Sequence, residues 1–149
     1  MKTRYSKEMS EVNRLYRETD GIYSKYAAMC GVSTTALCLL YSLYCAEGAC
    51  TQTRLAEDWG LPVQTVNSCL KTMEKQGDIR LEFAAGSRKH KQIFLTKQGE
   101  ALTERVVAPM IRAENEAFGS LSGEERRLLL TITKKHNALL RQLMNGAGE

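Results

Sequence analysis

The sequence contains no apolar run long enough to cross a lipid bilayer. Its most apolar stretch, residues 36–46, is shorter than the roughly 20 residues that a spanning helix needs, and Glu47 follows it directly. The first residues carry Lys2, Arg4 and Lys7 around no apolar core, so they do not resemble a secretory signal. We therefore expect a soluble, cytoplasmic protein with no membrane partner.

Metal ligands and disulfide partners are also scarce. Only two histidines occur among the 149 residues, at His90 and His136. The five cysteines are an odd number, and no two have C-x-x-C spacing: Cys30, Cys38, Cys45, Cys50 and Cys69. An odd count without an export signal argues against a disulfide framework, and the missing ligand pairs argue against a structural zinc site. We expect no metal and no cofactor, and cysteines that mostly fill the core.

Recognisable catalytic motifs are absent as well. The chain has no glycine-rich phosphate loop and no H-E-x-x-H pair. A cysteine nucleophile would need a histidine placed beside it, yet His90 falls in an expected loop and His136 lies near the carboxyl end. We do not expect an enzyme.

The positive charge of the chain is concentrated in one segment. The net charge is +4, from 21 Lys+Arg against 17 Asp+Glu. Residues 61–99 hold seven of the positive and three of the negative residues, which leaves +4, so the remainder of the chain sums to zero. A local basic surface attracts phosphate backbones, although a solvated face of no function would show the same excess.

Hydrophobic spacing and capping residues predict a mainly α-helical chain with one small β-hairpin. We expect helices over about 6–28, 33–46, 51–59, 62–76, 97–118 and from the capping box Ser122–Glu125 to about 145, with strands at 80–83 and 92–95. Ser33 and Thr96 are suited to cap their helices, and Gly77 to end one. This order is typical of a winged helix-turn-helix over about 33–96, and we expect one domain over 1–149.

The expected fourth helix has a polar face that is poor in acid. Its apolar stripe is Val66, Leu70 and Met73. The side chains opposite or flanking that stripe are candidates for reading DNA: Gln64, Thr65, Asn67, Ser68, Lys71 and Lys75. Amides and hydroxyls bond base edges in the major groove, and lysine pairs with guanine or phosphate. A merely solvated helix would more often mix Glu and Lys, so the pattern favours recognition.

Two further groups of residues support this interpretation. A basic loop between the two strands forms a candidate wing for the minor groove or flanking phosphates: Ser87, Arg88, Lys89, His90 and Lys91. Before the turn at Gly60, we expect Thr51, Thr53 and Arg54 to support the helix-turn-helix, with Thr51 or Thr53 capping the short third helix.

Two stretches resemble the MarR family, the multiple antibiotic resistance regulators. LAEDWGLPVQTVNSCLKTMEKQG at 55–77 is similar to the family's helix-turn-helix, and SRKHKQIFLTKQG at 87–99 is similar to its wing and the Leu-Thr-x-x-Gly that follows. The resemblance covers essentially the whole chain. The sequence departs from the family in having Ser87 where many members have an Asp that steadies the wing arginine, Lys89 where many have Arg, and Pro62 where a capping Ser is common.

The resemblance implies a homodimer joined by helices at 6–28 and 97–145, reading a palindromic double-stranded operator. It further implies a repressor released by a small phenolic or lipophilic effector, for which Tyr16, Tyr23, Tyr26, Tyr41 and Tyr44 are candidate pocket residues, although each is also an ordinary core aromatic. Two alternatives remain. One is a regulator of the same fold that senses oxidants through a cysteine, with Cys30 as the candidate. The other is a winged helix that contacts protein or RNA.

Overall fold

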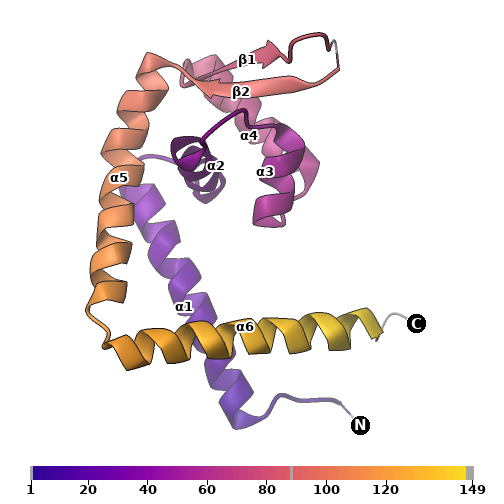
Figure 1. The fold of residues 1–149 in the computed structure, drawn as a ribbon, viewed down its shortest axis with the longest axis vertical. Coiled ribbons are helices and arrows are strands. Elements are labelled where there is room, and N and C mark those ends of the chain that lie inside the picture. Colours follow the sequence, from indigo (N-terminus) through magenta and orange to yellow (C-terminus); the bar gives the residue numbers. More distant parts are fainter. Residues whose placement is uncertain (1, 88, 147–149) are drawn as a thin grey trace. The chain divides into compact units, whose positions relative to one another are not determined.

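The computed structural model describes residues 2–87 and 89–146. In chain order the elements are α1 (Lys7–Met29), α2 (Thr34–Cys45), α3 (Gln52–Trp59), α4 (Val63–Gln76), β1 (Ile79–Phe83), β2 (Lys91–Leu95), α5 (Lys97–Gly119) and α6 (Gly123–Gly146) (Figure 1). The chain divides into two compact units, Met1–Ala108 and Pro109–Glu149, so the boundary falls at the proline inside α5. The expected mainly helical fold with one hairpin is confirmed.

Side chains cap most of the helices where the sequence predicts. The hydroxyl of Ser33 accepts a hydrogen bond from the Ala36 N–H at 3.1 Å and so begins α2. Thr51, rather than Thr53, caps α3 by accepting from the Arg54 N–H at 3.3 Å. These bonds satisfy backbone donors that the first turn of a helix leaves without a partner, which is why each element begins where it does.

The core of the first unit is built around α2. Leu37, Leu39, Leu40 and Leu43 of this helix are all buried, so α2 lies at the centre of the first unit. Around it α1, α3, α4 and β2 make their contacts. At the far end of α3, the Trp59 indole donates a hydrogen bond to Ser42 Oγ at 2.7 Å, and its ring meets Tyr41 edge-on at 5.9 Å. The short α3 is thereby fastened to α2.

The hairpin pairs β1 and β2 antiparallel, with Ile79 opposite Leu95 and Phe83 opposite Lys91. Each strand begins one residue earlier than the sequence predicts, at Ile79 and Lys91. Ile93 also bridges Cys50, whose carbonyl accepts its N–H at 2.9 Å, so the segment before α3 lies along the hairpin. The base of the hairpin is therefore fixed to the helical body, while its tip extends beyond it.

A joint of hydrogen bonds links the end of α4 to the start of α5. Gly77 ends α4 in the left-handed region at φ +84°, where glycine has no steric penalty. Thr96 Oγ1 accepts from the Gly99 N–H at 3.1 Å and donates to the Gly77 carbonyl at 2.6 Å. Gln98 Nε2 donates to the carboxylate of buried Asp78 at 2.8 Å. The Thr and Gly of the Leu-Thr-x-x-Gly sequence are thus the residues that form this joint.

The second unit consists of the end of α5 and the whole of α6. Ser122 and Glu125 form the predicted capping box: Ser122 N–H donates to Glu125 Oε2 at 2.7 Å, and Glu125 N–H donates to Ser122 Oγ at 3.2 Å. None of the described α6 residues is buried. The large apolar side chains that α6 leaves exposed are Leu128, Leu129, Leu130, Ile132, Leu139, Leu143 and Met144.

Within residues 2–87 and 89–146, no single helix is both long and apolar enough to cross a membrane. The bent pair of α1 and α2, which meet at 86°, passes the same test by length and composition alone.

Candidate nucleic-acid interface

Helix α4 is seated by its apolar stripe. Val66, Leu70 and Met73 are almost completely buried, and the helix contacts α2, α3 and β1 on that side. Pro62 occupies the N-cap position with φ −57°, where a missing N–H costs nothing, and no side chain caps the helix in its place. The packed stripe fixes the rotation of α4 about its own axis, so the opposite face is presented to solvent.

Most of the predicted reading residues lie on that solvent face. The exposed ones are Gln64, Thr65, Ser68, Lys71 and Lys75, whereas Asn67 is half-buried beside the packed stripe. Among the residues that the structure describes, neither Lys71 nor Lys75 forms a salt bridge. The α4 surface therefore offers hydrogen-bonding groups and two ammonium groups that no carboxylate neutralises at short range.

The residues expected to support the helix-turn-helix lie on or beside α3. Thr51 is half-buried and caps the helix, while Thr53 and Arg54 are exposed. Arg54 faces Asp58 one turn later, with Nε 3.7 Å from Oδ2. An exposed pair of this kind contributes little stability. The guanidinium of Arg54 is therefore held only weakly, and it remains accessible from solvent.

The turn at the tip of the wing is closed by Ser87, one of the three positions at which the sequence departs from the MarR pattern. Its hydroxyl oxygen accepts hydrogen bonds from the backbone N–H groups of Lys89 at 3.2 Å and His90 at 3.1 Å. Below this turn the Ala84 N–H donates to the His90 carbonyl at 2.8 Å. Lys89, His90 and Lys91 are exposed, and the predicted Arg88 lies outside the described residues. Ser87 thus organises the backbone of the turn while leaving the basic side chains exposed.

Two cation–aromatic pairs cross the hairpin, and neither of their aromatic residues was among the predicted site residues. The Arg80 guanidinium lies 4.9 Å from the centre of the Phe94 ring, and the Lys91 ammonium lies 5.4 Å from the centre of the Phe83 ring. Each pair joins directly opposite residues of the hairpin register. Strand alternation shows which side chains share a face, but which residues lie opposite one another depends on the register of the hairpin.

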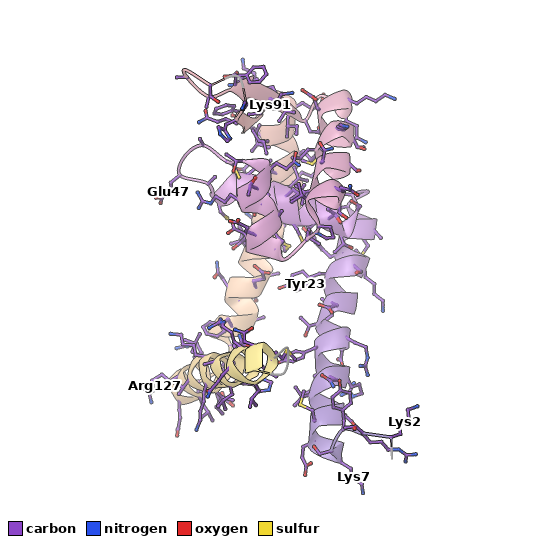
Figure 2. The ribbon with its side chains drawn as sticks, turned by 90° about the vertical axis from the view of Figure 1, so that its right-hand side faces the viewer. Lys2, Lys7, Tyr23, Glu47, Lys91 and Arg127 are labelled. Atoms are coloured by element: carbon purple, nitrogen blue, oxygen red, sulfur yellow. The ribbon has the colours of Figure 1, made fainter. Side chains whose placement is uncertain are left out.

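The two cations differ in whether their charge is paired with a carboxylate. Arg80 Nε lies 2.6 Å from a Glu82 carboxylate oxygen, and its Nη1 donates to the Leu95 carbonyl at 3.2 Å. Lys91 forms no salt bridge with any residue that the structure describes. Arg80 is thus bound into the hairpin itself, whereas the charge of Lys91 is available to a partner. Figure 2 shows Lys91 at the hairpin and Lys7 at the far end of α1.

A cleft of about 450 Å³ runs beside α4, between this helix and the turn from α1 to α2. It is lined by Gly31, Val32, Ser33, Thr35, Ala36, Thr65, Ser68, Cys69, Thr72, Met73 and Gln76. No tyrosine is among these described lining residues, so the candidate effector tyrosines are not gathered here. Thr65 and Ser68 belong both to this cleft and to the predicted DNA-reading face.

The cysteines differ in how deeply the fold covers them. Burial raises the pKa of the Cys38, Cys50 and Cys69 thiols above the usual value, and for Cys69 a hydrogen bond with Ser33 offsets part of that shift. Cys30, the redox candidate, is half-buried at the end of α1 and free, and Cys45 is free and exposed. The structure describes no cluster of three or more potential metal ligands among the residues it covers.

The chain is similar to known proteins both in sequence and in fold. No family model matches the chain. The uncharacterized HTH-type transcriptional regulator YwaE of Bacillus subtilis (strain 168) is 25% identical over 104 residues, which are 70% of this chain and 60% of that protein. The chain thus spans about 60% of the length of this curated relative.

Solved structures match over nearly the whole length. NMB1585, a MarR family regulator from Neisseria meningitidis, has a TM-score of 0.78 at 21% identity, covering 97% of this chain and 100% of that one. MepR of S. aureus, solved as a complex with DNA, has a TM-score of 0.75 at 20% identity, covering 92% and 99%. The chain therefore has the winged helix fold of the MarR family regulators, which the helix-turn-helix and wing sequences predicted.

Proposed function

We propose that this protein is a sequence-specific regulator of transcription that binds double-stranded DNA through α4 and the hairpin. The observation that carries the proposal is the α4 face, which combines exposed amide and hydroxyl groups with two ammonium groups free of short-range carboxylates. Such a face suits a helix that enters the major groove. The exposed lysines at the wing suit phosphates flanking the groove. The DNA complex of MepR, a protein of the same fold, supports the same partner.

The regulator acts as a homodimer on a palindromic operator. Support comes from α6, where Ile132 is 55% and Leu139 47% exposed although both are large and apolar. Apolar area of this extent on a long helix is typical of a surface that a second chain covers. Two-fold symmetry of such a dimer would place two α4 helices on half-sites about one helical turn apart.

The effect on the promoter is repression, relieved by a small phenolic or lipophilic ligand. This part of the proposal rests on the fold that the chain shares with the MarR family regulators. Tyr26 already donates a hydrogen bond to the Val106 carbonyl at 2.6 Å, so it joins α1 to α5 within the first unit. A ligand that altered this packing would change how α5 holds the joint at the end of α4.

The test is a gel-shift titration with the DNA upstream of the protein's own gene. A scrambled duplex of the same composition serves as competitor, and the titration is repeated at two salt concentrations. Two variants with the same charge change are compared, Lys71→Ala on α4 and Lys7→Ala, which lies far from the hairpin (Figure 2). We expect competitor-resistant binding that Lys71→Ala weakens and Lys7→Ala leaves unchanged.

Equal affinity for the native and scrambled DNA would contradict sequence-specific regulation through this operator. Binding that both lysine variants weaken equally would contradict the assignment to α4, because it would indicate an attraction to the net charge alone. A strong preference for single-stranded RNA or for a protein over the duplex would contradict DNA binding and would mean that the winged helix binds that other class of partner.

A further inference from the structure

The hairpin has one face that continues past the protein body. Side chains alternate along a strand, so Ile79, Leu81 and Phe83 share a face, and their register partners are Leu95, Ile93 and Lys91. The first two pairs rest on the core, since Ile79 and Ile93 are buried. The third pair lies beyond it, and Phe83 is 58% exposed. The Phe83 ring therefore lies outside the core, at the end of β1 where the chain enters the loop.

At that position the side chain opposite the ring is a cation. The Lys91 ammonium lies 5.4 Å from the ring centre of Phe83, within the range of about 6 Å for attraction between a cation and the electron-rich face of a ring. An isolated lysine on a surface samples many rotamers, and holding it in one conformation costs entropy. The ring restricts the ammonium before any partner arrives.

The second cross-strand pair is a natural control. Phe94 lies under the guanidinium of Arg80 in a similar way, but that guanidinium is already bonded to Glu82 and to the Leu95 carbonyl. Removing the Phe94 ring therefore perturbs a cation whose donors are engaged within the hairpin. Removing the Phe83 ring perturbs a cation that has its donors available.

We propose that Phe83 is a positioning residue of the DNA-binding wing, holding the ammonium of Lys91 where it contacts a backbone phosphate. This inference rests on the proposed function, because it requires that the hairpin lies against a duplex. Phe83 acts through Lys91 and touches no nucleotide itself. Phosphate contacts carry no sequence information, so the contribution of Phe83 is the same for every duplex.

The experiment combines a measurement without DNA and one with it. In the free protein, protons over the face of a ring are shielded, so the NMR signals of the Lys91 ε-methylene group are expected upfield of those of other lysines. Phe83→Leu should abolish that shift, while Phe83→Tyr, which keeps a ring, should retain it. Circular dichroism verifies that each variant keeps the helical fold.

The measurement with DNA uses fluorescence anisotropy on a labelled duplex of arbitrary sequence over a series of salt concentrations. We expect Phe83→Leu to weaken binding about threefold, because Lys91 must then lose its rotamer freedom on binding. Lys91→Gln should lower the slope of log K against log salt by about 0.9, and Phe83→Leu should cost nothing further in that background. Phe83→Tyr should bind as the native protein does, and Phe94→Leu should leave the slope unchanged.

The outcomes separate the two proposals. If the native protein binds the duplex and Phe83→Leu binds equally well with the same slope, the positioning role is wrong and the proposed function stands. If Phe83→Leu loses the same affinity with and without Lys91, the ring itself contacts the DNA, which also overturns the positioning role. If the native protein binds no duplex while the upfield shift is present, the proposed function fails although the ring holds the lysine.

Discussion

Gly99 lies so close to Asp78 that a β-carbon added to Gly99 would overlap the Asp78 carbonyl oxygen. Asp78 is the first residue after the αL cap of α4, and Gly99 belongs to the first turn of α5. Because the contact is between backbone atoms, neither side can move without shifting its whole element. The absence of a side chain at position 99 therefore allows the two helices to meet at their joint.

Gly99→Ala should destabilise the protein by about 3 kcal/mol or more, because overpacking against a backbone atom cannot be relieved by a rotamer change. The free energy of unfolding is measured by urea titration followed by circular dichroism. Gly119→Ala is the matched control, since its added β-carbon meets no atom within 4 Å. Similar stabilities of the two variants would contradict the tight joint.

Asn67→Ala and Lys89→Ala should weaken DNA binding in different ways. Asn67 lies on α4, where a side-chain amide can bond a base edge, so its removal should cost about 1–3 kcal/mol with the cognate base and relax preference at that base pair.

Lys89 lies on the wing, so its removal should weaken binding to all sequences and lower the salt slope by about 0.9. Binding to a panel of single-base operator variants at several salt concentrations checks both. An unchanged slope for Lys89→Ala would mean that this lysine does not contact phosphate.

Charges introduced on the apolar side of α6 should separate the proposed dimer. Ile132 and Leu139 are seven residues apart and so share a helix face. The double variant Ile132→Lys, Leu139→Lys should sediment as a monomer and lose operator affinity at least about tenfold, since a dimer doubles the contacts. The control variant Thr133→Lys, Asn137→Lys adds the same charge on other faces of α6. Dimers of equal stability in both variants would show that this stripe is not the interface.

Cys38, Cys50 and Cys69 should react slowly with iodoacetamide near neutral pH. Burial raises the pKa of each thiol above the usual 9.0, so the reactive thiolate is rarer than in an unfolded chain. Because the folded protein holds these thiol protons more tightly than the unfolded chain does, the free energy of unfolding falls as the pH rises from about 9 through the raised pKa values. Mass spectrometry after short labelling should find Cys45, which is exposed, modified first. Early labelling of Cys50 would contradict the buried position of that thiol.

If the protein senses oxidants through Cys30, peroxide should release it from DNA and Cys30→Ser should abolish the release. The gel shift is repeated with and without peroxide, and mass spectrometry identifies sulfenate or disulfide at each cysteine. Cys45→Ser is the control, because it removes another accessible thiol. Release that persists in Cys30→Ser would rule out this cysteine as the sensor.

The features that the sequence predicts well are those determined by neighbouring residues. Ser33 and Thr96 cap helices through atoms three residues away, and the Ser122–Glu125 box closes within one turn. The apolar period of α4 likewise predicts which of its faces is buried. Each of these interactions depends on residues only a few positions apart. The order of the elements and the solvent-facing side of α4 can therefore be predicted from the sequence.

The features that it predicts poorly depend on pairs distant along the chain. Asp78 is buried, and Gln98, twenty residues later, offsets the cost of that burial by donating a hydrogen bond to its carboxylate. The pairing of Phe83 with Lys91 depends on the exact register of the hairpin, and the expected strands each began one residue late. A one-residue change in register moves a side chain to the other face, so such pairs become visible only in the structure.

Trp59 is the only tryptophan in the sequence, and it lies where α3 is fastened to α2. Its indole emission therefore reports on a single place in the unlabelled protein, the seat of the helix-turn-helix. Because the indole N–H is bonded to Ser42 and the ring contacts Tyr41, any movement of α3 against α2 changes both the polarity around the ring and its quenching. The intrinsic fluorescence of Trp59 can therefore be used to follow the kinetics of DNA or ligand binding without labelling the protein.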